Sequence, residues 1–175
     1  MKEINIQYYK TAIGELIIGS FEGELCLMDY RYRKQRNRVD TRIQKGLSAE
    51  YVIKSDDIIE KTISQIDLYL RAETKHIDIP LLMVGSDFQK SVWKALLEIP
   101  YGSTASYMQI ANMIGNPKSV RAVANANGAN AIAVIIPCHR IIGSDGSLVG
   151  YAGGLKSKRK LLEIERAPIM GMLDL

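Results

Sequence analysis

Apolar and polar residues alternate through the first third of the chain, as they do in strands that bury one face. The alternation covers residues 4–8, and two further apolar runs cover residues 16–21 and 25–28. Between the last two runs, Glu22-Gly23 is a turn signal. The pattern predicts a short antiparallel meander.

The next periodic segment has the spacing of a helix. Asp56 and Asp57 suit the positive N-terminal end of a helix, and apolar residues recur at helical spacing from Ile59 to Leu70. This helix is expected to pack on the meander.

A change in pattern after this helix predicts a domain boundary. Residues 74–85 mix short apolar runs with Pro80 and Gly85, which interrupt regular structure. A chain of 175 residues is long enough for two small domains. The predicted domains are residues 1–83 and residues 84–175.

Two helices of the second half begin at capping boxes, in which a serine precedes a glutamine by three residues. Ser86 pairs with Gln89 and Ser106 pairs with Gln109. Each box satisfies backbone N–H groups at the start of a helix. Both helices are therefore predicted with defined N-termini.

A third helix is predicted from Lys118 to about Gly128, because Asn116-Pro117 supplies an N-cap and a proline suited to the first helical position. With the helix that begins at Ser106, it has the pattern of a helix-turn-helix unit. An αα-hairpin without a DNA role has the same pattern. The pattern alone does not separate the two.

The last segments combine an apolar run with glycine-rich connections. Residues 131–136 form a continuous apolar run of the length of a buried strand, which leads to the sequence Pro-Cys-His-Arg at residues 137–140. A glycine-rich loop, residues 150–154, then precedes a final helix that ends near Glu165.

Composition narrows the function classes. With no run of 18 apolar residues and no signal peptide, the chain is expected to be cytoplasmic, without a membrane partner. Two cysteines and two histidines argue against structural zinc, and neither a metal nor another cofactor is predicted. The net charge of +4 meets a loose criterion for a nucleic-acid partner. In the basic stretch at residues 31–45, a solvated loop or helix face is favoured over a DNA contact.

The two cysteines have different surroundings. Cys26 lies among apolar residues of a predicted strand and is interpreted as a buried hydrophobic residue. Cys138 is flanked by His139 and Arg140, whose positive charge favours the thiolate. On an extended segment His139 would point away from Cys138, so a bridging water or a bend is required. Glu165 is the candidate acceptor that orients the imidazole.

Taken together, these segments resemble the O6-alkylguanine-DNA alkyltransferases, also called methylated-DNA–protein-cysteine methyltransferases. The sequence Ile-Ile-Pro-Cys-His-Arg-Ile-Ile around Cys138 is similar to the active-site signature of that family. Other similar segments occur in the family's order and spacing: residues 101–107, residues 116–123, Asn130 and residues 150–155. The resemblance is specific from about residue 86 to residue 165 and general in residues 1–83.

The resemblance implies an α/β (α+β) fold, with a small ribonuclease H-like N-terminal domain and a helical, winged-helix-like C-terminal domain that carries the helix-turn-helix. It implies a DNA-repair enzyme that reacts once. Cys138 would take the alkyl group from guanine O6, and less readily from thymine O4, and keep it as a thioether. The implied partner is double-stranded DNA with alkylated guanine, bound in the minor groove by a monomer.

The resemblance also implies roles for single residues. His139 would act through a water, with its ring held by Glu165, so that Cys138 becomes a thiolate. Tyr107 would protonate or hydrogen-bond guanine N3 as the base leaves, and its ring would push on the phosphate backbone during base flipping. Arg121 would fill the gap in the stack. The remaining implied residues are Asn130, which would hold the two halves of the active-site region together; Ser119, Ala122 and Asn125 at the DNA; and Ile141, Tyr151 and Ala152 around the guanine.

Two rival functions belong to other classes. A lesion-binding protein without alkyl transfer would lack the cysteine, so Cys138 argues against it. A helix-turn-helix regulator with Cys138 as a redox sensor would need base-reading side chains, and the third predicted helix is rich in small residues such as Ala122. Small residues suit a close approach to a minor groove, and they suit packing against a neighbouring helix equally well.

Overall fold

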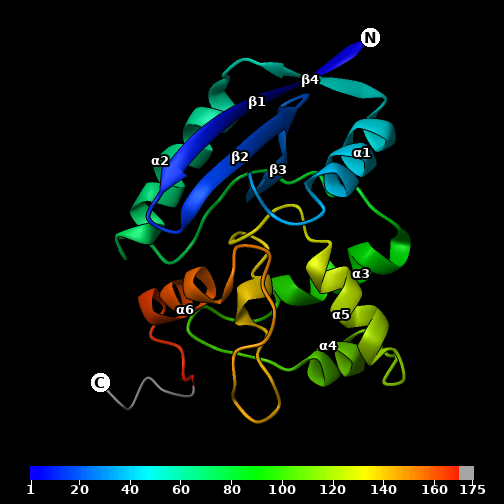
Figure 1. The fold of residues 1–175 in the computed structure, drawn as a ribbon, viewed down its shortest axis with the longest axis vertical. Coiled ribbons are helices and arrows are strands. Elements are labelled where there is room, and N and C mark those ends of the chain that lie inside the picture. The colour runs from blue at the N-terminus through cyan, green and yellow to red at the C-terminus, as the bar shows by residue number, and fades with distance from the viewer. Residues whose placement is uncertain (170–175) are drawn as a thin grey trace. The chain divides into compact units, whose positions relative to one another are not determined.

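The computed structural model describes residues 1–169, and the chain divides into two compact units, Met1–Gly85 and Ser86–Leu175. The division falls two residues beyond the expected one. The fold is mixed α+β, with the sheet in the first unit and short helices joined by irregular segments in the second (Figure 1).

The first unit is built on a four-stranded sheet. The predicted meander is confirmed as β1 (Lys2–Thr11), β2 (Gly14–Phe21) and β3 (Glu24–Tyr30), which pair antiparallel in sequence order. A further strand, β4 (Ala49–Ile53), pairs parallel to β1 and gives the order β3-β2-β1-β4. The sequence pattern does not predict β4, because this five-residue edge strand is mostly exposed or half-buried.

One helix of the first unit packs on the sheet as expected. In α2 (Asp57–Leu70), Asp56 is the N-cap and accepts a hydrogen bond from the Ile59 N–H at 3.0 Å. Ile59 and Ile66 are completely buried, and the helix contacts β1, β2 and β3. The predicted apolar face is therefore the packing face.

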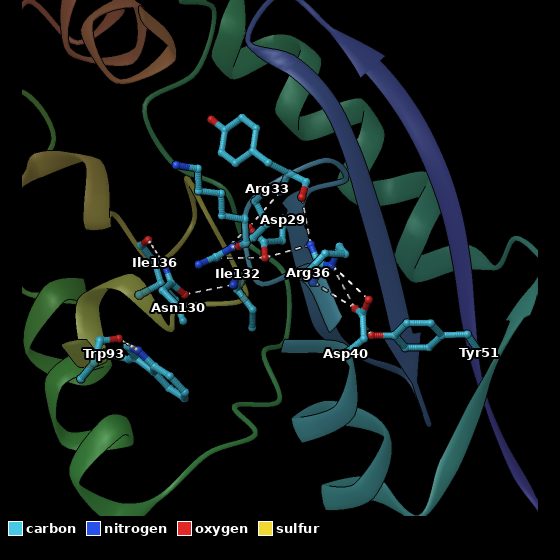
Figure 2. A network of polar contacts seen from close by, with 12 residues as sticks. Asp29, Arg33, Arg36, Asp40, Tyr51, Trp93, Asn130, Ile132 and Ile136 are labelled. Atoms are coloured by element: carbon cyan, nitrogen blue, oxygen red, sulfur yellow. Dashed lines mark hydrogen bonds and ion pairs between the residues drawn. The ribbon is translucent and has the colours of Figure 1, made fainter. Parts of the chain in front are cut away.

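The basic segment contains the other helix, α1 (Arg36–Leu47), and it is not uniformly solvated. Asp29 is fully buried at the end of β3, where it pairs with Arg33 at 3.2 Å and Arg36 at 3.0 Å (Figure 2). The side chains of these arginines are only 8% and 15% exposed. The expected solvated face is therefore wrong for both residues, because a buried carboxylate requires cationic partners.

The second unit consists of short helices. Their bounds are α3 (Asp87–Leu97), α4 (Tyr107–Met113), α5 (Val120–Gly128), the 3₁₀ turn η1 (Cys138–Arg140) and α6 (Leu155–Ile164). Both predicted capping boxes are present, at Ser86 and Ser106. The buried Trp93 donates through Nε1 to the Ala126 carbonyl at 2.9 Å, which ties α3 to α5. Within residues 1–169, no helix has the length and apolar character needed to cross a membrane.

The helix-turn-helix pattern is present with one correction. In Figure 1, α4 and α5 lie side by side, and they contact each other. The expected start of α5 at Lys118, capped by Asn116, is wrong: the helix begins at Val120 after the N-cap position Ser119. The Ser119 N–H and hydroxyl both donate to the Asn116 carbonyl, at 3.0 and 2.6 Å, so the preceding residues form a turn.

Candidate active site

Asn130 determines how the chain reaches the segment that contains Cys138. Its Nδ2 donates to the Ile136 carbonyl at 2.8 Å, and its Oδ1 accepts from the Ile132 N–H at 2.9 Å (Figure 2). Val134, with a φ of 71°, lies in the left-handed region between these two contacts. The strand expected at residues 131–136 is therefore wrong. One buried amide takes up backbone hydrogen bonds that a neighbouring strand would otherwise satisfy.

Cys138 is the first residue of η1, and the residue is 5% exposed. Because η1 is a turn of 3₁₀ helix, the extended geometry assumed for Cys138 and His139 is wrong. The chain bends here, which is one of the two alternatives that the sequence allowed. The thiol and the imidazole thus project from successive positions of one tight turn. Both are buried.

Glu165 receives hydrogen bonds from His139, Arg140 and Gly102. Its Oε2 lies 2.6 Å from His139 Nε2 and 3.1 Å from Arg140 Nη2. Its Oε1 accepts from Arg140 Nε at 2.8 Å and from the Gly102 N–H at 3.1 Å. Since an ionised carboxylate only accepts, the proton on His139 belongs on Nε2, and Nδ1 is the acceptor nitrogen.

The electrostatics of His139 follow from its burial. Burial lowers the pKa of the imidazole, the Glu165 carboxylate raises it, and the burial effect is the larger. His139 is therefore neutral at pH 7. A neutral imidazole held by a carboxylate can take up a proton from an acidic neighbour.

Gly102 is required for this arrangement. Its φ of +78° lies in the left-handed region, and a Cβ at this position would lie 3.1 Å from the Glu165 carbonyl oxygen. The close approach lets the Gly102 N–H reach the Glu165 side chain. This explains chemically why a glycine stands in the segment 101–107.

Tyr107 is positioned through a short backbone pairing. The Ala105 N–H donates to the Arg140 carbonyl, and the Ala105 carbonyl accepts from the Ile142 N–H, both at 2.9 Å. This pairing joins the end of η1 to the start of α4, whose first residue is Tyr107. Burial raises the pKa of the Tyr107 hydroxyl, and the charge of Cys138 raises it further. The phenol therefore stays protonated near neutral pH.

The residues predicted to meet DNA occupy the accessible side of α5. Arg121, Ala122 and Asn125 are exposed, Ser119 is half-buried, and Val123 on the opposite side is fully buried. Arg121 is the second residue of the helix. The exposed side combines one long cationic side chain with small ones, as the sequence predicts.

Known proteins resemble this chain over most of its length. Residues 87–167 match the family model for the 6-O-methylguanine DNA methyltransferase, DNA binding domain. The methylated-DNA–protein-cysteine methyltransferase of Methanosarcina barkeri is 42% identical over 156 residues, which are 89% of this chain and 93% of that protein. The enzyme of the same name from Mycobacterium leprae is 40% identical over 175 residues, 98% of each chain. The chain belongs to the methylated-DNA–protein-cysteine methyltransferase family.

A solved structure extends this likeness to the whole fold. The crystal structure of Mycobacterium tuberculosis OGT in complex with DNA is similar with a TM-score of 0.79 and 37% identity, covering 94% of this chain and 95% of that one. The shared architecture is the mixed α+β fold. As a member of the methyltransferase family, the chain is an enzyme of that class.

Lys158 is a buried residue of this methyltransferase fold that the sequence pattern did not single out. It has no exposed surface, and its Nζ donates to the Val149 carbonyl at 2.7 Å, which ties the loop before α6 to that helix. Burial lowers its pKa to about 8, while the charge of Cys138 acts to raise it. A signal existed: Lys158 precedes Leu161 and Leu162 by three and four positions, which places it on the apolar face.

Arg140 is a second residue whose part was not predicted. Besides its two contacts with Glu165, its Nη1 donates to the Ile99 carbonyl at 2.6 Å. The sequence suggested only that its charge favours a thiolate. A buried arginine with three acceptors instead holds the segment after α3, the turn η1 and the end of α6 together.

The residues predicted around the guanine lie on two segments of the second unit. Ile141 is fully buried directly after η1, whereas Tyr151 and Ala152 are half-buried in the loop before α6. Their contact with a base stays a prediction. Within residues 1–169, no three His, Cys, Asp or Glu side chains form a group that could hold a metal ion.

Proposed function

We propose that Cys138 accepts the alkyl group of O6-alkylguanine in double-stranded DNA, once per molecule. The observation that carries this proposal is the buried thiol in the same tight turn as His139, whose neutral imidazole is held by Glu165 at 2.6 Å. Membership of the methyltransferase family and the DNA complex of the M. tuberculosis relative support DNA as the partner.

The proposed reaction is a displacement at an sp³ carbon. The thiol proton passes to His139, and the Cys138 thiolate attacks the alkyl carbon. As the carbon–sulfur bond forms, the bond between carbon and guanine O6 breaks, and its electron pair stays on the base. The guanine anion takes a proton at N3 from the hydroxyl of Tyr107. The products are a thioether, an unmodified guanine, the His139 imidazolium and the Tyr107 phenolate. The last two return to neutrality by proton exchange with water, whereas the thioether has no ready leaving path.

Access to the thiol requires that the base leave the DNA stack. Cys138 is buried, and guanine O6 lies inside a duplex, so the two atoms meet only when the nucleotide is flipped. Arg121 is exposed at the start of α5 and long enough to occupy the gap. Tyr107 lies at the start of α4, where its ring can push on the phosphate backbone.

Intact-protein mass spectrometry after exposure to a duplex with O6-methylguanine tests the proposal. Wild-type protein and Cys26→Ser should each gain one methyl group per molecule, and Cys138→Ser should gain none. Cys26 is the matched control because its thiol is 1% exposed and burial raises its pKa to about 12. Methyl transfer to Cys26, or repeated turnover with excess substrate, would contradict the mechanism.

A second comparison separates base flipping from chemistry. Arg121→Ala should slow the reaction with duplex far more than the reaction with benzylguanine, a free base that needs no flipping. Equal slowing with both substrates would remove Arg121 from the flipping step. Binding of damaged duplex without any alkyl uptake by wild-type protein would instead favour a lesion-binding protein.

A further inference from the structure

Charge is unevenly distributed over the first unit. Residues 1–85 contain thirteen Lys or Arg residues and thirteen Asp or Glu residues, so the unit is neutral overall. Seven of the thirteen cations lie in residues 31–45, where Asp40 is the only acid. A neutral unit with its cations gathered in one segment has a locally positive surface.

Part of this segment is neutralised by a buried ion network. Arg33 and Arg36 pair with Asp29, and Arg36 also pairs with Asp40 at 3.0 Å (Figure 2). Tyr51 on β4 donates to Asp40 at 2.8 Å. Two carboxylates thus balance two guanidinium groups, and together they fix the start of α1 against the sheet.

Three other cations of the segment are exposed, and no ion pair involves them within residues 1–169: Lys34, Arg38 and Lys45. Arg38 and Lys45 lie seven residues apart on α1, which places them on one face two turns apart. Lys34 lies four residues before Arg38, in the turn that leads into the helix. We name Lys34, Arg38 and Lys45 the basic face.

This arrangement works against the stability of α1. The first turn of the helix contains Arg36 and Arg38 and no acid, and the N-cap Gln35 makes no side-chain hydrogen bond. Cations near a helix N-terminus are disfavoured by the helix dipole, and like charges four residues apart repel. Burial, together with the adjacent charge of Arg33, lowers the pKa of Arg42 on the same helix. An anion bound at this surface would relieve the repulsion.

We propose that the basic face binds phosphate groups of the DNA backbone, through residues of the first unit that lie outside the helix-turn-helix. The proposal rests on the proposed function, which makes double-stranded DNA the partner. Lysine and arginine at exposed positions suit phosphate contacts that are independent of base sequence. The ion network of Asp29 and Asp40 holds the segment in place before DNA arrives.

Salt-dependent binding of the full chain to a duplex oligonucleotide tests this surface. The variant Lys34→Gln/Arg38→Gln/Lys45→Gln should make the negative slope of log K against log salt shallower by about 2 to 3, since each lost phosphate contact removes roughly 0.9 from its magnitude. The matched variant Lys10→Gln/Lys54→Gln/Lys61→Gln removes the same charge from exposed lysines of the same unit. It should make the slope shallower by less than about 1.

The proposal would be overturned if the basic-face variant and the control variant had the same slope, whether or not that slope differed from that of wild-type protein. If the triple variant does not fold, the single variants Lys34→Gln and Lys45→Gln serve in its place, because each should make the slope shallower by about 1. Reaction with benzylguanine measures the Cys138 site without DNA. If wild-type protein takes up no alkyl group, but only the basic-face variant shows a shallower salt dependence, the proposed function is rejected and the proposed DNA-binding surface is retained.

Discussion

Each unit of the molecule buries one carboxylate among cationic side chains. In the first unit, Asp29 is surrounded by two arginines, whose charges are permanent. In the second unit, Glu165 is shared between Arg140 and His139, and the imidazole can change its protonation. A buried carboxylate with cationic partners therefore anchors a helix in the first unit. In the second unit it also holds an imidazole that can accept a proton, next in sequence to a thiol.

The two units also differ in how their backbone is satisfied. Strand ladders take up the backbone groups of the first unit, and α2 covers the sheet. In the second unit, Asn130, Arg140 and Lys158 bond directly to carbonyls of irregular segments. Removal of one polar side chain should therefore harm the second unit more than the first.

The largest effect is expected for Arg140→Leu, which leaves the Glu165 carboxylate buried without its guanidinium partner. Breaking a buried pair in this way costs about 3 to 5 kcal/mol of unfolding free energy. Trp93 is the only tryptophan, so its fluorescence in a urea titration reports on the second unit. Arg33→Leu in the first unit should cost less, because Arg36 still pairs with Asp29.

The matched control for this substitution is Arg159→Leu. Arg159 pairs with Glu163 at 4.0 Å, and both side chains are about two-fifths exposed, at 42% and 40%. An exposed pair of this kind contributes about 0 to 1 kcal/mol. If Arg140→Leu and Arg159→Leu unfold at the same urea concentration, the buried cluster does not hold the second unit together.

Asn130→Ala should cause the second-largest loss of unfolding free energy. It leaves the Ile136 carbonyl and the Ile132 N–H without their partner, and each buried unsatisfied group costs about 1 to 3 kcal/mol. Asn125→Ala, at an exposed position of α5, should change stability by less than about 0.5 kcal/mol. Urea titrations of both variants measure the difference. A loss below about 1 kcal/mol for Asn130→Ala would mean that the turn at residues 131–136 forms without this amide.

Glu165→Gln should lower the rate, and it should also destabilise the second unit because it leaves the buried Arg140 without its carboxylate. Loss of a group that orients a reacting imidazole reduces activity by about 10- to 100-fold. Because the carboxylate raises the pKa of His139, its removal lowers that pKa further. As the pH is lowered, the rate of the variant should therefore start to fall at a lower pH than the rate of wild-type protein. Single-turnover rates across pH, with benzylguanine as substrate, measure both effects, and an unshifted acid decline would exclude His139 as the proton acceptor.

The lowered pKa of His139 also determines how the stability of the second unit changes with pH. The pKa of His139 is lower in the folded state than its ordinary value of 6.5, so below about pH 6.5 the unfolded chain binds more protons. The free energy of unfolding of the second unit should fall as pH drops through this range. His139→Gln should lessen that fall, as measured by Trp93 fluorescence.

Sequence periodicity predicts the parts of this molecule in which backbone groups are satisfied by regular hydrogen bonding. The meander, α2 and the two capped helices are predicted by alternation, helical spacing and serine–glutamine pairs. The turn at residues 131–136 is not predicted, because its apolar residues have the pattern of a strand. Its conformation is set by hydrogen bonds from Asn130, which precedes the apolar residues. The contact between His139 and Glu165 joins positions 26 residues apart. The residue types suggested Glu165 as the acceptor, and the resemblance to a family added its role in forming the thiolate. For Lys158 the helical spacing places the residue on the apolar face, but only the structure shows the Val149 carbonyl that makes burial of the charge possible.

The smallest effects are expected at the two capping boxes, which share their chemistry but begin helices of different length and content. Ser86→Ala and Ser106→Ala each remove a hydroxyl that accepts a backbone N–H, at 3.1 and 3.2 Å, and each should cost about 1 kcal/mol. The melting temperature of the second unit should fall by about 4 to 8 °C in both variants.

The rates of these two variants should differ. The helix that begins after Ser106 has seven residues, and Tyr107 is its first, whereas the eleven-residue helix after Ser86 carries none of the residues proposed to react. Fraying of the first turn of α4 displaces the phenol that is proposed to protonate the leaving guanine, and about 1 kcal/mol corresponds to a rate loss of roughly fivefold. Single-turnover kinetics with methylated duplex should therefore show this loss in Ser106→Ala and a wild-type rate in Ser86→Ala. Equal rates in two equally destabilised variants would show that the start of α4 need not be held rigidly, and Tyr107 would then lose its proposed part in the reaction.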